Sequence, residues 1–272
     1  MNREPVTIDN TQVRAHCTAA ADGRITFRLP ALQAPEPQLL LCLRPKKNNP
    51  EETRIVLPLE TVDDGGRAVL EPQPTLTEGR WDLYLLPEPG APRQRLRPGL
   101  RDLRALVDGD TRTWPSPVAV RVPYTTKDGF LAIRTWLRTA HAEAAGIDVT
   151  DRSMTVTARL HGATLAAGAV VRLRARGPEG AVRTVEPHIG SDGRFSFTVP
   201  FEELTATGQV WDVSLRPRPD EKAPYIRIGR LFDDVADRKE IFVYPTVTVG
   251  DAAVRPYYTV DNDLSVEVTA TA

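Results

Sequence analysis

A short phrase occurs twice in the chain, and this repeat limits the possible folds more than any other feature. "WDLYLLPEP" begins at Trp81 and "WDVSLRPRP" begins at Trp211. The match extends further, because "VPYTTKDGFLAIRT" from Val122 aligns without gaps with "RPYYTVDNDLSVEV" from Arg255. Upstream, "QVRAHC" and "DDGGRAVLEP" are matched by "MTVTAR" and "GSDGRFSFTVP". The spacing far exceeds the roughly 20–50 residues of a solenoid repeat, so the sequence predicts a tandem duplication of one domain.

Each copy is built from short segments in which apolar and polar side chains alternate, as in "RFSFTV" from Arg194. Such alternation places the apolar side chains on one face of a strand. The 24 prolines, with Gly, Asp and Asn clusters between segments, favour short strands over helices. We expect strands over 25–29, 39–44, 54–59, 67–72, 81–86, 118–124, 131–137, 154–160, 169–176, 194–199, 210–215, 225–231, 241–247 and 264–270. These segments predict an all-β protein of two tandem immunoglobulin-like antiparallel β-sandwich domains.

The domain boundaries follow from the last strand of the first copy. We expect a first domain over residues 1–144, a short linker over 145–153 and a second domain over 154–272. Trp81 and Trp211 are expected to be core anchors of equivalent strands. Because neighbours on a strand point to opposite faces, the Asp after each Trp is expected to face outward and pair with an Arg. "TKDGF" and "VDNDL" are expected to be hairpin turns, since Asp-Gly and Asn tolerate a positive φ.

Charge, hydropathy and cysteine content limit the classes of function. The formal net charge of −1 gives no field that would attract nucleic acid or an anionic membrane. No secretory signal or transmembrane run is visible, so we expect a cytoplasmic protein without membrane insertion. Cys17 and Cys42 are then expected to be packed, reduced thiols. The predominance of Arg over Lys, with many Ala, Gly and Pro residues, is typical of a high-GC genome such as that of an actinomycete.

The sequence shows no motif that identifies an enzyme. It contains no nucleotide-binding glycine loop and no nucleophile elbow, and its four histidines are scattered, so we expect no metal and no cofactor. His16 and Cys17 are strand neighbours that face opposite ways, which argues against a Cys–His pair. The weak catalytic candidates are Asp102, Asp233 and Asp234. The last two belong to "FDDVADRKE", which is typical of a solvated turn whose acids pair with nearby arginines.

Aromatic and cationic residues occur together near the end of the second copy. Tyr257, Tyr258 and Arg255 lie in one segment, and Tyr225 and Arg227 lie in another. Sugars dock on exposed aromatic rings while flanking Arg side chains bond their hydroxyls. We therefore list these five residues as candidate contacts for a ligand or partner. The alternative is the ordinary composition of β-sandwich strands, which are rich in Tyr and Arg.

The segment "VRPYYTVDNDLSVEV", with "WDVSLRP", "RIGRL" and "DRKEIFVYP", resembles a known module. It is similar to the β-sandwich modules that trail the catalytic domain in actinobacterial teichoic-acid-type glycosyltransferases and glycerophosphotransferases. The resemblance spans both copies and implies a non-catalytic module that supports oligomerisation or polymer binding. Nothing in the chain resembles the nucleotide-sugar-binding domain of those enzymes, so the resemblance carries over no catalytic residue.

Three functional hypotheses follow. The first is a non-enzymatic accessory scaffold or binding module of cell-envelope polymer or glycan assembly. It would act with a protein partner such as a separately encoded transferase. The second is a module that binds carbohydrate or an anionic polymer, which would need an arginine-lined groove. The third is a small-molecule, transferase-like enzyme with a pocket between its domains. The first two hypotheses involve a protein, glycan or polymer partner but no nucleic acid. All three are compatible with a homo-oligomer.

Overall fold

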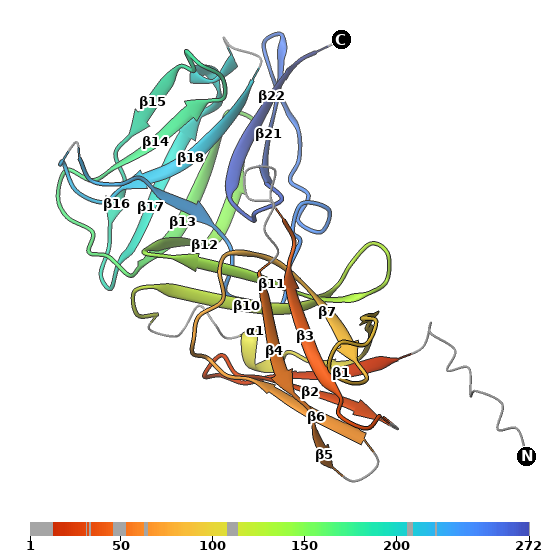
Figure 1. Cartoon of the computed structure of the whole chain (residues 1–272). Coiled ribbons are helices and arrows are strands. Elements are labelled where there is room, and N and C mark those ends of the chain that lie inside the picture. Colours follow the sequence, from red (N-terminus) through yellow and green to blue (C-terminus); the bar gives the residue numbers. More distant parts are fainter. Residues whose placement is uncertain are drawn as a thin grey trace, which may run out of the picture. The chain divides into compact units, whose positions relative to one another are not determined.

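A computed structural model describes residues 13–30, 32, 34–45, 53–62, 65–107, 114–205, 209–220 and 222–271. Strands dominate these residues, as Figure 1 shows. The helical elements among them are two single turns, α1 (Arg104–Val107) and η2 (Phe201–Glu203). The chain divides into two compact units, the first formed by residues 1–107 and 119–137 and the second by 108–118 and 138–272. The expected all-β fold is confirmed.

The first unit holds two sheets. One has the order β5 (Glu60–Val62), β6 (Gly65–Leu70), β2 (Ile25–Pro30), β1 (Arg14–Ala19) and β9 (Arg97–Asp102). The other has the order β10 (Val118–Thr125), β11 (Leu131–Arg138), β7 (Gly79–Leu86), β3 (Gln38–Leu43) and β4 (Arg54–Pro58), and β8 (Gln94–Arg95) also pairs with β7. The core forms because alternate residues of these strands are apolar. On β7, for example, Trp81, Leu83 and Leu85 are all buried in it.

The strands of the second unit belong to one hydrogen-bonded sheet. Its order is β16 (His188–Ile189), β17 (Arg194–Pro200), β13 (Ser153–His161), β12 (His141–Val149), β19 (Ile226–Gly229), β18 (Val210–Arg216), β22 (Leu264–Ala270), β21 (Ala252–Tyr258) and β20 (Val247–Val249). Off this path, β14 (Val170–Ala175) pairs with β18 and with β15 (Val182–Val185). Trp211 of β18 and Val213 lie in a separate core from that of the first unit.

Both units pair their strands in the same order. In the first, β6, β2, β1 and β9 are consecutive neighbours, and β17, β13, β12 and β19 repeat this order in the second. The neighbours β10, β11, β7, β3 and β4 are likewise repeated by β21, β22, β18, β14 and β15. In each unit the first strand also pairs in parallel with a later one, β1 with β9 and β12 with β19. Strand β1 therefore corresponds to β12 and not to β13, with which the sequence comparison matched it.

The position of β12 also differs from the expected linker. Residues 145–149 continue this strand, and the compact units divide between Leu137 and Arg138. The sequence of β12, "HAEAAGIDV", is rich in Ala and carries a Gly, residues that are depleted in strands. Its pairing with β13 shifts register between Ala144 and Gly146, so the strand contains a bulge. Tertiary pairing, rather than local preference, makes this segment a strand.

The expected strands otherwise match the observed ones, with one exception. Residues 241–246 carry no strand, and only Val247 of the expected segment joins β20. Pro245 has no backbone N–H to donate to a ladder. The rings of Phe242 and Tyr244 instead pack against Tyr258, with centroids 6.0 and 6.2 Å from its ring. The apolar residues that predicted a strand therefore belong to a loop that packs on Tyr258.

Several local expectations are confirmed. Trp81 and Trp211 are 1% and 0% exposed. The two hairpin turns are present, with φ of +79° at Gly129 and +59° at Asn262. Cys17 and Cys42 are buried and form no disulfide with each other. No helix among the described residues has the length and apolar character needed to cross a membrane.

Candidate functional site

The outer face of strands β14, β18, β22 and β21 carries most of the polar side chains considered below. On β18, Trp211, Val213 and Leu215 are buried in the core, so Asp212 and Ser214 face the other way. The same alternation on β14 directs Arg172 and Arg174 outward between Val171, Leu173 and Ala175, and Arg176 follows at the end of the strand. One side of this sheet is therefore apolar and the other is polar.

The register of the strands brings these outward residues into rows. Asp212 lies opposite Arg174 on one side and opposite Ser265 on the other. Ser265 in turn lies opposite Tyr257 on β21. Directly opposite residues on neighbouring strands have Cβ atoms about 5 Å apart. A row from Arg174 to Tyr257 thus crosses four strands.

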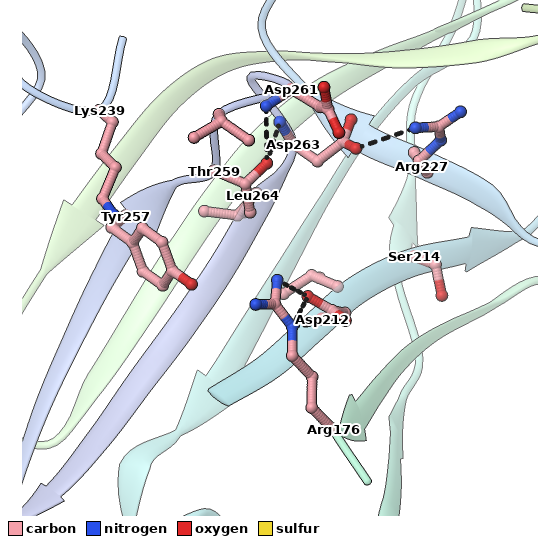
Figure 2. Close-up of a pocket in the computed structure, with 12 residues that line it drawn as sticks. Arg176, Asp212, Ser214, Arg227, Lys239, Tyr257, Thr259, Asp261, Asp263 and Leu264 are labelled. Atoms are coloured by element: carbon pink, nitrogen blue, oxygen red, sulfur yellow. Dashed lines mark hydrogen bonds and ion pairs between the residues drawn. The ribbon is translucent and has the colours of Figure 1, made fainter. Parts of the chain in front are cut away.

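Two adjoining hollows lie on this face. The larger has a volume of about 570 Å³ and the smaller about 400 Å³, and both include Arg176, Asp212 and Ser214 in their walls. We call the combined feature the ligand groove. Its polar lining consists of Arg172, Arg174, Arg176, Asp212, Ser214, Arg227, Lys239, Tyr257, Thr259, Asp261 and Asp263. Figure 2 shows the larger hollow.

The centre of the ligand groove is an ion pair between Arg176 and Asp212. The Arg176 Nη2 and Nε atoms donate to Asp212 Oδ1 at 2.7 and 3.1 Å, and Nε also lies 3.0 Å from Oδ2. Ser265 Oγ donates to the same carboxylate at 2.9 Å. The hydrogen bond to Asp212 raises the pKa of Arg176 above its usual value. Half of each charged side chain is exposed, so both groups can also reach a ligand.

A second ion pair lies at the hairpin turn between β21 and β22. Arg227 Nη1 donates to Asp263 Oδ2 at 3.2 Å, as Figure 2 shows. The turn is held by Thr259, whose hydroxyl oxygen accepts from the backbone N–H groups of Asp261 and Asp263 at 3.2 and 3.3 Å. This arrangement places two carboxylates and one guanidinium at one end of the ligand groove.

Two aromatic rings lie beside the cationic groups. Tyr257 and Arg176 both line the ligand groove, and burial raises the pKa of the Tyr257 hydroxyl. The Lys239 ammonium lies 5.9 Å from the centroid of the Tyr257 ring. Tyr225 packs beneath the Arg172 guanidinium at 4.3 Å. Both rings combine an apolar face with neighbouring donors, a combination that suits a ring with hydroxyl substituents.

The charges of the ligand groove determine which chemistry it can recognise. Five basic side chains face three carboxylates, so the lining carries a net positive charge. Arginine forms paired hydrogen bonds with phosphate or carboxylate oxygens. The Asp side chains accept hydrogen bonds from ligand hydroxyls. Among the described residues, no group of three or more His, Cys, Asp or Glu side chains is placed to hold a metal ion.

The structure separates the five residues proposed from the sequence. Tyr257 and Arg227 line the ligand groove. Tyr225 is 38% exposed and stacks against the groove residue Arg172. Arg255 faces the same side of the sheet and pairs with Glu267 at 2.6 Å. Tyr258 is 1% exposed and belongs to the core, so it is not part of this surface.

The three acidic candidates lie elsewhere. Asp102 pairs with Arg104 at 2.6 Å, and this contact lowers the pKa of Asp102 to about 2. Asp233 forms ion pairs with Arg230 and Arg238, as expected for the acids of this segment, and Asp234 is exposed. Contrary to the expected solvated turn, Arg238 is fully buried. None of the three acids lines the ligand groove.

The candidate site residues predicted from the sequence did not include the arginines of β14. Arg172, Arg174 and Arg176 alternate with apolar residues in "RLRAR". This period of two would have placed all three on the outer face of a strand. Asp261 and Asp263 were assigned to a hairpin turn in preference to a calcium-binding loop. The sequence did not show that their hairpin and β14 border one hollow, because that depends on strand register.

The first unit contains a corresponding ion pair. Asp82, which follows Trp81, accepts from Arg44 Nε and Nη2 at 2.9 and 2.8 Å. The expectation that the Asp after each Trp pairs with an Arg is therefore confirmed in both units. In the first unit Arg95 also donates to Asp82 at 3.1 Å, and the same guanidinium stacks on Phe130 at 4.1 Å. Phe130 aligns with Asp263, so an aromatic ring replaces a carboxylate at this position.

No protein family model matches the sequence, and no curated protein is significantly similar to it. Solved structures show remote similarity. S. aureus TarS has 13% identity and a TM-score of 0.39, and the match covers 72% of this chain and 29% of TarS. A structure of TarS residues 217–571 gives 14% identity and a TM-score of 0.39 over 70% of this chain and 44% of that one.

A pullulanase from Anoxybacillus sp. LM18-11, complexed with maltotriose, has 13% identity and a TM-score of 0.25 over 76% of this chain and 24% of that one. The chain therefore spans less than half of each of these three structures. Similarity at these scores is too low to carry a functional assignment, so the function must be argued from the site itself.

Proposed function

We propose that the chain is a non-enzymatic binding module of cell-envelope polymer or glycan assembly. In this proposal its second unit binds an anionic, hydroxyl-rich polymer in the ligand groove. The observation that carries the proposal is the groove lining itself, in which five basic side chains and Tyr257 border two hollows that share Arg176, Asp212 and Ser214. Small-molecule enzymes typically enclose their substrates, whereas a polymer chain needs a path that is open at both ends.

The spacing of the arginines favours a polymer over a single anion. Arg172 and Arg174 lie on β14, and Arg176 directly after it, at every second residue. Second neighbours on one face of a strand are about 7 Å apart. A row of guanidinium groups at this spacing can contact successive phosphates of an extended chain. The carboxylates of Asp212 and Asp261 are then placed to accept hydrogen bonds from its hydroxyl groups.

The setting of this function rests on the sequence resemblance to modules of teichoic-acid-type transferases. We further propose that the two units are immunoglobulin-like sandwiches that arose by duplication, which their shared strand order supports. A cytoplasmic location, an actinobacterial origin and assembly with a separate transferase or with further copies belong to the same proposal. The Asp–Arg pairs that follow Trp81 and Trp211 are then a retained feature of the ancestral unit.

A binding measurement tests the proposal. We expect the chain to bind a glycerol-phosphate oligomer in isothermal titration calorimetry. The double variant Arg172→Ala/Arg174→Ala should weaken binding at least tenfold, because each charged hydrogen bond contributes about 1.5–3 kcal/mol. The matched control is Arg152→Ala/Arg194→Ala, which removes two exposed charges of the same unit outside the ligand groove. Equal losses in both double variants would show that the binding is not located in the groove.

A further inference from the structure

The second unit contains a buried chain of polar side chains that reaches the ligand groove from the core side. Glu143 and His141 lie on β12 and are 4% and 0% exposed. The Glu143 carboxylate accepts hydrogen bonds from the backbone N–H groups of Leu231 and Phe232 at 2.8 and 3.0 Å. Burial of a charged group is costly without such partners. The carboxylate is therefore anchored to the loop that follows β19.

Arg138 determines the orientation of the His141 ring. An arginine can only donate hydrogen bonds, and Arg138 Nη1 lies 3.2 Å from His141 Nδ1. Nδ1 must therefore accept, and the ring proton is on Nε2. That nitrogen lies 2.8 Å from Glu143 Oε2, to which it donates. The imidazole is thus held in one tautomer between a fixed donor and a fixed acceptor.

The other end of Arg138 contacts a residue of the ligand groove. Its Nη2 atom lies 2.8 Å from Asp263 Oδ1, and its side chain is 4% exposed. The second oxygen of Asp263 accepts from Arg227, which is half exposed in the groove. Figure 2 shows Asp263 directed toward Arg227. A continuous chain of contacts therefore leads from Glu143 through His141, Arg138 and Asp263 to Arg227.

We propose that Arg138, held by His141 and Glu143, is a positioning residue for the ligand groove. It fixes the Asp263 carboxylate, and Asp263 then holds the Arg227 guanidinium in the orientation that a ligand meets. An exposed arginine loses side-chain entropy when a ligand immobilises it, and an arginine that is already fixed loses less. The inference rests on the proposed function, since it assigns a supporting residue to the same groove.

A double-mutant cycle tests this inference. Binding of a glycerol-phosphate oligomer is measured for the wild-type chain, Arg138→Met, Asp263→Asn and the double variant. We expect Arg138→Met to weaken binding about tenfold, and to have little further effect once Asp263 is replaced, because coupled residues are not additive. An unchanged Kd for Arg138→Met, or the same loss in both backgrounds, would overturn the inference.

Two further variants separate positioning from a general loss of stability. Arg121→Met removes another buried arginine, 7% exposed in the first unit, and should leave the Kd unchanged. If Arg138→Met does not fold, Arg138→Lys replaces it in the test, because lysine keeps the positive charge. A lysine lacks the planar fork that reaches both His141 and Asp263, so we expect an intermediate loss of binding. Wild-type affinity in Arg138→Lys, or a loss in Arg121→Met as large as that in Arg138→Met, would contradict a positioning role.

The readouts distinguish this inference from the proposed function. A wild-type chain that binds no glycerol-phosphate oligomer refutes the proposed function. The same double-mutant cycle measured on the free energy of unfolding then tests the contact between Arg138 and Asp263 without any ligand. A coupling near zero in that cycle refutes the contact on which the inference depends. A clear coupling shows that Arg138 holds Asp263, whether or not this oligomer is the ligand.

Discussion

At the scale of single residues, strand alternation allowed some roles to be predicted and left others open. The burial of Trp81 and Trp211 could be predicted, as could the Arg partner of the Asp after each, because neighbours on a strand face opposite ways. The same rule says that only one of Tyr257 and Tyr258 faces outward, but it does not say which. The contact between Arg138 and Asp263 joins residues distant in sequence, so no local pattern indicates it.

Glu143 gives a pH-dependent stability that can be measured. The pKa of the Glu143 carboxyl is raised from 4.5 to about 7, mainly by burial. The folded state therefore binds this proton more tightly than the unfolded state does. The contribution of Glu143 to the free energy of unfolding falls as the pH rises from about 4.5 to about 7, by up to about 3 kcal/mol. Below this window the two states bind the proton equally, and the contribution no longer changes.

The variant Glu143→Gln removes this titration while keeping an amide oxygen that can accept hydrogen bonds. In urea unfolding at pH 5 and pH 8, the wild-type chain should lose stability relative to the variant as the pH rises. Other titrating groups are common to both proteins and cancel in the comparison. A constant difference between the two proteins at both pH values would show that Glu143 does not titrate in this range.

The buried cysteines are expected to be unreactive in the folded protein. Burial raises the pKa of the Cys17 thiol to about 12, and its side chain is 2% exposed. Because the thiolate is the reactive form, a disulfide reagent should leave Cys17 unmodified in native buffer and modify it after denaturation. Quantification of the released thiolate tests this. Rapid modification of the native protein at Cys17 would contradict the packing described for β1.

At the scale of secondary-structure elements, local preference identified many of the strands that contain β-branched and aromatic residues, although it missed β21 (Ala252–Tyr258). It failed for β12, whose Ala-rich sequence is held as a strand by pairing with β13 and β19. It failed in the opposite direction for residues 241–246, where aromatic residues pack a loop onto Tyr258. The ligand groove depends on the register of five strands, β14, β18, β19, β21 and β22. The sequence could therefore indicate its components Tyr257 and Arg227 but not the hollow they share.

The hairpin between β21 and β22 should be sensitive at Asn262. Its φ of +59° is disfavoured for residues with a Cβ, by about 1–2 kcal/mol for most side chains. Its buried side chain also accepts from the Arg238 N–H at 3.2 Å and donates to the Val235 carbonyl at 3.3 Å. Asn262→Ala should therefore lower the free energy of unfolding by about 2–4 kcal/mol.

Asn262→Gly is the matched control for this prediction. Glycine adopts a positive φ without strain but forms no side-chain hydrogen bond. Its loss of stability should be smaller than that of Asn262→Ala by about 1 kcal/mol. Equal losses for the two variants would show that the backbone conformation is not what selects Asn at this turn.

At the scale of the whole chain, two units share one order of strand pairing and one buried Trp followed by an Asp–Arg pair. They differ in the chemistry beside that pair. The first unit places Phe130 under two arginines, 4.1 and 4.3 Å from the ring centroid. The second places Asp263 at the aligned position, where it holds Arg227 and Arg138. We therefore expect ligand binding to reside in the second unit, with the first unit as its structural counterpart.

The measurement that tests the central claim most directly is the salt dependence of binding to a glycerol-phosphate oligomer. Binding of each phosphate by the ligand groove releases counterions into solution. The more phosphates are neutralised, the more steeply the affinity falls as the salt concentration rises. We predict that affinity falls steeply between about 50 and 200 mM salt, and that Arg172→Ala/Arg174→Ala has a clearly shallower slope than Arg152→Ala/Arg194→Ala. Absent binding, or a slope that both double variants share, would contradict an arginine-lined polymer site in the second unit.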